Sequence, residues 1–394
     1  TSGLITAVIA ASLGAKVALI EKHLMGGDCL NVGCVPSKGM VRAARAWADL
    51  RNAAEFGLHV PAGVKYDFGA VMARMRKLRA RISQNDSAHR YAKLGVDVYI
   101  GSGRFTSSDT IQVDGSAGNR TLTFAKAAIC TGARAAAPPT PGLNEAGYLT
   151  NETVFSLTEL PARIGVIGAG PIGCELAQSF ARFGSQVYLV EAEHGILPNE
   201  DRDAADIVEQ QMLRDGVMLL CCGKELLIKK TEAGKRMTVD SHGRQYDVMV
   251  DEILVGVGRA PNVEGIGLDA VGVEYDKSGV KVNHRLQTTN PRIYAAGDIC
   301  SRYKFTHAAD AMAQIVIQNA LFPHPLGLAY ASVESLTMPW CTFTEPEIAH
   351  VGIYEKDART KGIEVETYTY KLDEVDRAIL DGENKGFARI HIQK

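Results

Sequence analysis

The feature that most constrains the fold is a segment in which an apolar strand, a glycine-rich turn, a helix and a second strand follow one another and end at Glu191. The turn has the pattern G-x-G-x-x-G, with its glycines at Gly168, Gly170 and Gly173. The helix pattern ends at Gly184, and Glu191 lies 18 positions after Gly173. This order and spacing predict a Rossmann-type dinucleotide-binding unit, in which the glycines let the backbone approach a pyrophosphate and the acid binds a ribose hydroxyl.

The start of the chain has the same spacing. Gly3 and Gly14 are 11 positions apart, as are Gly173 and Gly184, and Glu21 lies 18 positions after Gly3. The first residues therefore repeat the helix and second strand of the unit without its first strand and first two glycines. We expect the sequence to begin inside a first dinucleotide-binding unit and so to be a fragment of a longer chain.

Apolar, β-branched runs alternate with helix-period segments and glycine turns along the chain, which predicts an α/β fold with parallel sheets. Residues 135–142, rich in proline, predict a linker, and the pattern changes to short strands and turns near residue 335. Two further predictions are a long basic helix over residues 66–94 and a small antiparallel layer made by residues 96–100, 110–113 and 121–129.

The segment G-G-D-C-L-N-V-G-C-V-P-S-K at residues 26–38 places Cys29 and Cys34 before a predicted helix. We expect a disulfide to form and break there, and the helix end and Lys38 to lower a thiol pKa. Half of a zinc site and inert core thiols are the alternatives. A zinc site would need another Cys or His pair of suitable spacing, which does not follow in the sequence. Inert core thiols are disfavoured because the segment is glycine-rich and polar. The neighbours Cys221 and Cys222 are expected in a strand, on opposite faces, where they cannot share a metal ion.

Composition excludes several classes of protein. Lys and Arg total 43 against 45 Asp and Glu, a net charge of −2, which argues against a nucleic-acid binder. Eight cysteines are too few for a disulfide-stapled scaffold, and no signal-peptide pattern or membrane span is apparent. We therefore expect a protein of the reducing cytoplasm with no membrane and no nucleic-acid partner.

Residues 26–38 resemble the redox-active segment of the class I flavoprotein disulfide reductases (pyridine nucleotide-disulfide oxidoreductases), the family of dihydrolipoamide dehydrogenase, glutathione reductase and mercuric reductase. Further segments resemble the family's motifs in order. They are C-T-G-A at 130–133, the glycine turn at 168–173, G-R-A-P-N at 258–262, A-G-D at 296–298 and T-F-T-E-P-E at 342–347.

The resemblance implies two Rossmann-type domains, one for FAD and one for NAD(P), and a partial α+β dimerisation domain. The implied divisions are 1–150 for the FAD domain, 151–280 for the NAD(P) domain, 281–334 for a segment that completes the FAD domain, and 335–394 for the start of the dimerisation domain. A homodimer is implied as well.

By the same resemblance, Cys34 faces the flavin and Cys29 is the interchange thiol that meets the substrate. Lys38 lies beside the flavin N5 and pairs with Glu175. The residues implied to bind FAD are Gly3, Glu21, Gly27, Lys38, Thr131, Gly132, Asp298 and Thr306. The residues implied to bind NAD(P) are Gly168, Gly170, Gly173, Glu191, Gly258 and Arg259. The carboxylate of Glu191 would repel a 2′-phosphate, which favours NADH over NADPH, and no resident metal site is predicted.

The implied reaction passes electrons from NAD(P)H through FAD to a Cys29–Cys34 disulfide and on to mercuric ion or a small disulfide. Residues 35–44, 338–352 and 376–378 resemble the mercuric reductase branch, whereas Glu191 and Asp28 depart from it. The alternatives are a dihydrolipoamide dehydrogenase and, from another class, a flavin- or soft-metal-binding protein without turnover. The C-terminal Cys pair or His–Glu pair that separates the branches would follow Lys394.

Overall fold

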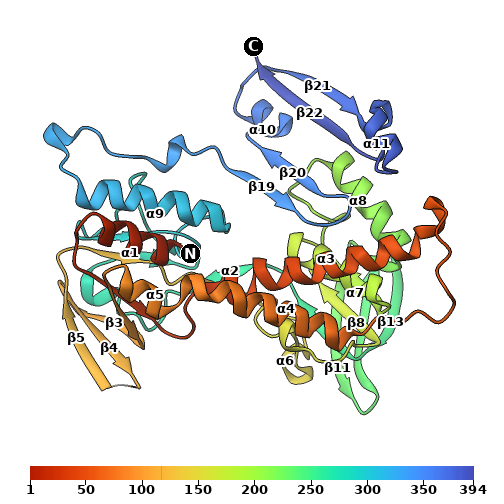
Figure 1. Ribbon diagram of the computed structural model, residues 1–394, viewed down its shortest axis with the longest axis horizontal. Coiled ribbons are helices and arrows are strands. Elements are labelled where there is room, and N and C mark those ends of the chain that lie inside the picture. The colour runs from red at the N-terminus through yellow and green to blue at the C-terminus, as the bar shows by residue number, and fades with distance from the viewer. Residues whose placement is uncertain (117) are drawn as a thin grey trace. The chain divides into compact units, whose positions relative to one another are not determined.

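The structure is a computed structural model that describes residues 1–116 and 118–394, and it confirms the mixed α/β class (Figure 1). The chain forms two compact units. The first unit comprises Thr1–Pro36, Arg76–Ala135 and Arg259–Leu336. The second comprises Ser37–Met75, Ala136–Gly258 and Thr337–Lys394. In the described part of the chain, no helix combines the length and the hydrophobicity needed to cross a lipid bilayer.

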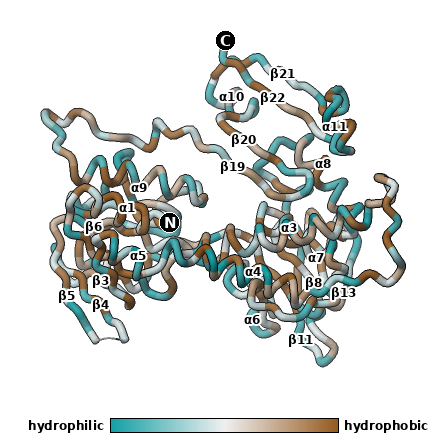
Figure 2. Tube along the Cα trace, viewed as in Figure 1, coloured by the Kyte–Doolittle hydropathy of each residue, from teal (hydrophilic) through white to brown (hydrophobic). Residues whose placement is uncertain are grey.

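The first unit is built on parallel strand pairs covered by helices. Strand β1 (Val17–Glu21) pairs with β2 (Val96–Ile100), and β6 (Ala127–Ile129) pairs with β18 (Ile293–Ala295), both in parallel. Helix α1 (Ser2–Ser12) lies beside α9 (Thr306–Leu321), and hydrophobic residues run along both, brown in Figure 2. The shorter elements of this unit are α2 (Gly27–Val32), β7 (Ala133–Ala135), β15 (Arg259–Pro261), β16 (Tyr275–Asp276) and β17 (Gly279–Val280).

The antiparallel layer is present but has different members from those predicted. It consists of β3 (Ser102–Ser107), β4 (Thr110–Gly115) and β5 (Gly118–Thr123). The prediction for residues 96–100 was wrong, because Val96 packs with Ala7 and Tyr91 and so belongs to the parallel pair under α1. Residues 127–129 likewise form β6 and pair with β18.

The long basic helix predicted for residues 66–94 is interrupted. Helix α4 (Phe68–Ser83) is followed by a 3₁₀ turn and then by α5 (Ala88–Lys93). The Ser87 side chain accepts a hydrogen bond from the Arg90 N–H, which caps a new helix start. A polar cap inside the periodic segment therefore ends one helix and begins another.

The second unit contains a four-stranded parallel sheet in the order β10 (Val217–Leu220), β9 (Gln186–Val190), β8 (Arg163–Ile167) and β14 (Glu252–Val255). Helix α7 (Pro171–Phe183), which follows β8, is buried along most of its length, with Phe180 and Phe183 among the largest buried side chains. Strands buried on both faces explain the continuous apolar runs in the sequence. Gly184, with φ of 102°, ends α7 as predicted.

The remaining elements of the second unit are α3 (Cys34–Arg51), most of which lies in this unit, α6 (Leu143–Ala146), α8 (Arg202–Arg214), and the antiparallel sheet β11 (Lys224–Thr231), β12 (Gly234–Ser241) and β13 (Arg244–Val250). After them come the hairpin β19 (Pro339–Thr342) with β20 (Ile348–Val351), α10 (Glu355–Thr360), and β21 (Val365–Lys371) paired with β22 (Phe387–Gln393), with α11 (Asp376–Leu380) between those two strands.

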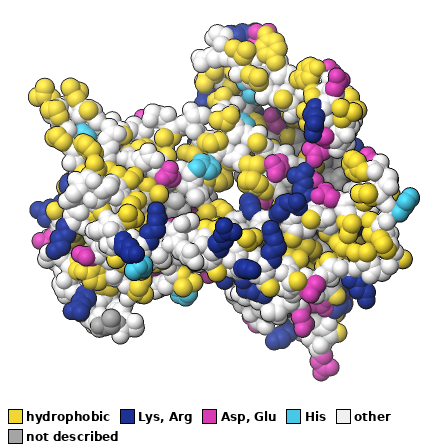
Figure 3. All heavy atoms as spheres, in the orientation of Figure 1, with side chains coloured by type: hydrophobic (Ala, Val, Ile, Leu, Met, Phe, Trp, Pro, Cys, Tyr) yellow, Lys and Arg dark blue, Asp and Glu magenta, His cyan; other side chains and the backbone are white. Residues whose placement is uncertain are grey.

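Strands β21 and β22 carry exposed hydrophobic side chains, visible at the top of Figure 3. Tyr368 is opposite Ile390 in the register of this pair, and both are more than half exposed, at 53% and 64%. Tyr370 and Ile392 are exposed as well. This pair of strands therefore presents an apolar surface.

In the glycine turn after β8, one position has no room for a side chain and another does. A Cβ on Gly173 would lie 1.9 Å from the Gly168 carbonyl oxygen, whereas a Cβ on Gly170 would meet nothing within 4 Å. We expect Gly173→Ala to destabilise the protein by about 2 kcal/mol or more, because backbone must move. Gly170→Ala should change stability by less than about 1 kcal/mol. Thermal unfolding of the two variants measures the difference, and equal stabilities would contradict the turn geometry.

Candidate active site

Two short segments of the first unit bring Cys29 and Cys34 together. Cys29 lies in α2 and Cys34 begins α3, with Gly33 between the two helices. A Cβ on Gly33 would lie 2.9 Å from the Asp28 carbonyl oxygen, so a glycine is needed where the chain turns. In an unbroken helix, residues five positions apart would point about 140° apart. The break at Gly33 therefore makes the thiols neighbours.

The electrostatics of Cys29 differ from the expectation. A hydrogen bond with Cys34, together with burial, raises the pKa of the Cys29 thiol well above its ordinary value, and a hydrogen bond with Thr306 opposes this shift. The prediction of a lowered pKa was therefore wrong for Cys29, since the partner thiol and the loss of solvent dominate. The sulfur of Cys34 lies 3.3 Å from the Thr306 hydroxyl oxygen, and Thr306 begins α9.

The predicted FAD residues of the first unit lie at the carboxyl ends of its parallel strands. Glu21 ends β1 and accepts a hydrogen bond from the His23 N–H at 2.8 Å. Thr131 and Gly132 follow β6, and Asp298 follows β18. In open α/β sheets, ligands bind at this edge.

The turn at Thr131 and Gly132 is held by Asn262. The Asn262 side chain donates to the Thr131 carbonyl at 2.9 Å, and the Thr131 hydroxyl donates to the Asn262 carbonyl at 3.0 Å. The Asn262 N–H donates to the Gly132 carbonyl at 3.0 Å. These three bonds join two motifs that are about 130 positions apart in the sequence.

The first residues of α1 pack against the segment that precedes Asp298. The Ser2 hydroxyl donates to the Ala296 carbonyl at 3.0 Å. A Cβ on Gly297, whose φ is 85°, would lie 2.7 Å from the Ser2 oxygen. A Cβ on Gly3 would lie 3.2 Å from the Cys130 Cβ. Small residues thus keep the N-terminal end of α1 close to the strand ends.

Arg259, which was predicted to bind NAD(P), lies in the first unit and contacts two acidic residues there. Its guanidinium pairs with Asp28 and lies 3.2 Å from the Asp298 carboxylate. The buried Nε nevertheless donates no hydrogen bond to any residue that the structure describes. Burial raises the pKa of Asp298, and the positive charge of Arg259 opposes that shift. Asp28, at a position where we expected a departure from the family, therefore has an ion-pair partner.

These residues fit FAD. An acid at the end of β1 suits a ribose, and the buried donor of Arg259 beside the buried acceptor of Asp298 suits a polar chain. Gly27 has φ of 63°, and a Cβ on it would lie 3.4 Å from the backbone nitrogen of Thr1. With no side chain at Gly27, the backbone there can approach a bound group closely.

The second unit contains the predicted NAD(P) turn. Gly168, with φ of 99°, approaches the Gly256 carbonyl so closely that a Cβ would lie 2.8 Å from its oxygen. Glu191 accepts a hydrogen bond from the Ala169 N–H at 2.6 Å, so the acid is held against the glycine turn. Gly258 has φ of 127° and follows β14. Strand, turn, helix and acid thus meet as the spacing predicts.

The predicted ion pair between Lys38 and Glu175 is present. The ammonium of Lys38 lies 2.7 Å from the Glu175 carboxylate, whose side chain is only 5% exposed. Glu175 also accepts the Phe343 N–H at 3.0 Å, and the Lys38 ammonium lies 4.4 Å from the centre of the Phe343 ring. A cation–π contact and a second hydrogen bond therefore reinforce the pair.

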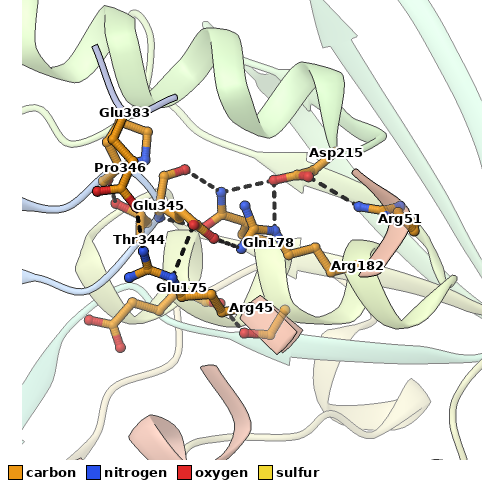
Figure 4. A network of polar contacts seen from close by, with 11 residues as sticks. Arg45, Arg51, Glu175, Gln178, Arg182, Asp215, Thr344, Glu345, Pro346 and Glu383 are labelled. Carbon is orange, nitrogen blue, oxygen red and sulfur yellow. Dashed lines mark hydrogen bonds and ion pairs between the residues drawn. The ribbon is translucent and has the colours of Figure 1, made fainter. Parts of the chain in front are cut away.

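A buried polar network fixes the segment that carries Phe343 to helix α7 (Figure 4). Gln178 donates to the Glu345 carbonyl at 2.7 Å and accepts the Glu345 N–H at 2.9 Å. Arg182 pairs with Asp215 at 2.9 Å and also with the Glu345 carboxylate. Sequence reasoning missed these residues. Gln178, Arg182 and Asp215 belong to no motif, and they are far in the sequence from Glu345, which lies in the T-F-T-E-P-E segment but was not singled out there.

The prediction for Cys221 and Cys222 was wrong in its premise. Strand β10 ends at Leu220, so both cysteines lie beyond it, and Cys222 has φ of 54°. The alternation of side chains along a strand does not apply to them. Their surroundings are taken up in the last part of these Results.

The fold and the site together define a two-nucleotide oxidoreductase with a dithiol centre, and sequence comparison agrees. A family profile described as pyridine nucleotide-disulphide oxidoreductase matches residues 1–313, and the dimerisation domain of the same family matches residues 338–394. The chain belongs to this family of flavin- and pyridine nucleotide-dependent enzymes.

Mercuric reductases and dihydrolipoyl dehydrogenases are both among the curated relatives of the chain. The chain is 34% identical over 378 residues to a mercuric reductase of Staphylococcus aureus, covering 96% of this chain and 67% of that protein. It covers only 60% of a Bacillus cereus mercuric reductase, at 32% identity and over 98% of its own length. A dihydrolipoyl dehydrogenase of Bacillus subtilis is 30% identical, over 99% of this chain and 83% of that protein.

Solved structures of flavoprotein disulfide reductases have the same fold. The HOCl-induced reductase RclA from Escherichia coli, solved as a Cu(II) complex, matches with a TM-score of 0.85 at 28% identity, covering 100% of this chain and 84% of that one. LpdA from Mycobacterium tuberculosis matches with a TM-score of 0.88 at 25% identity, covering 100% of this chain and 85% of that one.

The raised pKa of Cys29 predicts how its alkylation depends on pH. In the reduced protein, Cys29 should react with iodoacetamide more slowly than an ordinary thiol at mildly alkaline pH, because only the thiolate reacts. Cys34→Ala removes the largest raising contact and should move the pH profile of Cys29 to lower pH. Thr306→Val removes an opposing contact and should move it to higher pH. Peptide mass spectrometry measures the rate, and added free cysteine serves as the ordinary thiol. Burial raises the pKa of Cys341 to about 11, so Cys341 serves only as a site whose profile should not differ among the three proteins. Shifts of Cys29 in the reverse directions would contradict this account.

Proposed function

We propose that the chain is the catalytic part of an FAD-dependent oxidoreductase that uses NAD(P)H to reduce a Cys29–Cys34 disulfide, and that the resulting dithiol reduces mercuric ion or a small disulfide. The observation that carries the proposal is the pair of neighbouring thiols held against Thr306 in the unit whose strand ends fit FAD. Membership of the pyridine nucleotide-disulphide oxidoreductase family supports NAD(P)H as the electron donor.

When bound, FAD supplies the two-electron link between nicotinamide and disulfide. The protein's own part is to hold the reacting groups. Opening the disulfide takes up two electrons and two protons and yields the thiols of Cys29 and Cys34. With a disulfide substrate, the Cys29 thiolate attacks one sulfur, and Cys34 then displaces the substrate thiol and restores the protein disulfide. With mercuric ion, the same two electrons reduce the metal ion as the disulfide re-forms.

We propose that Lys38 stabilises negative charge that develops near the flavin. Lys38 lies one helical turn after Cys34 on α3, and Glu175 holds its ammonium in place. The buried Glu175 cannot leave its partner without exposing a charge to an apolar surrounding, so the ammonium is oriented before the reaction begins.

Mercuric ion is the leading substrate because two close thiols are soft ligands and because mercuric reductases are among the relatives at 32% identity or more. Dihydrolipoamide is the second candidate, supported by dihydrolipoyl dehydrogenases at 29% to 33% identity. For assembly, we propose a homodimer that covers the apolar surface of β21 and β22, the strands within the matched dimerisation domain.

The central step is tested by removing each thiol in the FAD-loaded protein. Cys29→Ser and Cys34→Ser should each lower NADH-driven reduction of mercuric ion and of disulfides by about 100-fold or more, because no protein disulfide can form. Cys341→Ser, a control outside the pair, should keep the parent rate. Full activity in Cys29→Ser would rule out the dithiol mechanism. In the parent protein, comparison of kcat/KM for mercuric ion with that for dihydrolipoamide decides between the two substrates, and a preference for dihydrolipoamide would reject the leading one.

We also propose that Glu191 selects NADH. Its carboxylate lies at the glycine turn, where the 2′-phosphate of NADPH would meet a like charge. Glu191→Gln should therefore raise kcat/KM for NADPH relative to NADH by about tenfold, the change expected from removing roughly 1.4 kcal/mol of repulsion. Glu193→Gln removes an equal charge two residues away, at an exposed position, and should leave the ratio unchanged. A parent enzyme that prefers NADPH would contradict the assignment.

A further inference from the structure

We propose that His194, Cys221, Cys222 and His242 form a binding site for one zinc ion, separate from the redox pair. All four residues belong to the second unit. Each offers one ligand atom, and these four atoms all lie within 4.8 Å of one another. The expectation that no residue set in this chain would hold a resident metal is therefore replaced by a specific set of ligands.

The distances within this cluster approach those of a tetrahedral zinc site. The Cys221 sulfur lies 3.2 Å from His242 Nε2, and the Cys222 sulfur lies 3.5 Å from His194 Nδ1. Zinc–sulfur bonds of about 2.3 Å and zinc–nitrogen bonds of about 2.05 Å at tetrahedral angles give a sulfur–nitrogen separation of about 3.6 Å. A small inward movement of the wider pairs is all that coordination requires.

The donor set favours zinc among the common cations. Two thiolates and two imidazoles make an S₂N₂ set, which suits a tetrahedral borderline-soft ion and not the oxygen-preferring magnesium or calcium. Four protein ligands leave no open position for water or substrate. We therefore infer a structural ion and not a second catalytic centre.

Three separate turns bring the ligands together. His194 follows β9, and Cys221 and Cys222 follow the neighbouring parallel strand β10. His242 lies in the two-residue turn between β12 and β13, where Ser241 pairs with Arg244. His242 and Gly243 both have positive φ, at 53° and 76°, as in a type I′ turn, a place usually taken by Asn, Asp or Gly.

Hydrogen bonds between the segments hold the cluster before any ion binds. The Cys222 N–H donates to the Glu193 carbonyl at 3.0 Å, and the Ser241 hydroxyl donates to the Cys221 carbonyl at 2.6 Å. The His194 and His242 rings lie 6.0 Å apart, nearly perpendicular. His194 and His242 are both exposed, so an ion can enter from solvent. Bound zinc would therefore clamp three loops beside Glu191.

The site is tested in the FAD-loaded full chain with Cys29→Ser and Cys34→Ser, so that the redox pair cannot bind metal. After chelator treatment and gel filtration, the protein is given zinc, passed through a second column and assayed for metal. We expect one zinc per chain, and with cobalt in place of zinc the visible spectrum of a tetrahedral ion with thiolate-to-cobalt absorption. Absence of retained zinc in this protein would overturn the proposal.

Single variants show which side chains bind the ion. Cys221→Ser, Cys222→Ser, His194→Gln and His242→Asn should each weaken zinc binding at least tenfold, and the two Cys variants should reduce the thiolate-to-cobalt absorption. Asn suits the left-handed conformation at position 242, so this variant keeps the turn. The controls His59→Gln and Cys341→Ser should bind zinc as the parent does. Unchanged zinc binding in a Cys221→Ser, Cys222→Ser double variant would reject the site.

Thermal unfolding separates loss of a ligand from loss of the fold. Zinc should raise the melting temperature of the parent, because an ion that binds only the folded state stabilises it. The metal-free variants should melt close to the metal-free parent and gain nothing from zinc. A variant that melts normally and is still stabilised by zinc to the parent's extent would contradict the assignment of its side chain.

Discussion

The contact between Cys29 and Cys34 is the interaction on which the account of this protein depends, and it exists because the helix is broken at Gly33. Without the break, the two thiols would point to different sides of one helix. Gly33 lets the chain fold back over the Asp28 carbonyl, and Thr306 at the start of α9 meets the resulting pair. Burial and the hydrogen bond with Cys34 raise the pKa of the Cys29 thiol and so favour its protonated form.

Within the second unit, a buried network of side chains holds Lys38 in one orientation. Glu175 is buried in α7 and accepts both the Lys38 ammonium and the Phe343 N–H. Gln178 and Arg182, further along the same helix, bind the Glu345 segment that follows Phe343. Because helix α7 anchors all of these groups, the orientation of Lys38 is coupled to the packing of a segment that lies 168 positions after Glu175 in the sequence. The buried network thus positions Lys38 and the segment at Glu345, and its formation removes several charged groups from water.

The sequence predicted what depends on short-range spacing and failed where distant segments decide. The matched distances from Gly3 to Glu21 and from Gly173 to Glu191 located both nucleotide units, and resemblance located Lys38 and its partner Glu175. The strand at residues 96–100 was assigned to the wrong sheet because its neighbour β1 is far away in the sequence. The contacts of Arg259 with Asp28 and Asp298, and the histidines near Cys221, were not predicted for the same reason. Their partners come from other turns, and neither periodicity nor spacing reports a contact of that kind.

The most direct test of the central claim counts thiols before and after the protein receives electrons. The oxidised, FAD-loaded protein is treated with NADH without oxygen, alkylated, and digested for mass spectrometry, alongside a sample without NADH. The account predicts that NADH makes two cysteines newly available, Cys29 and Cys34, with one NADH consumed for each pair. Consumption of NADH with no new thiol at these positions, or new thiols at other cysteines, would contradict it.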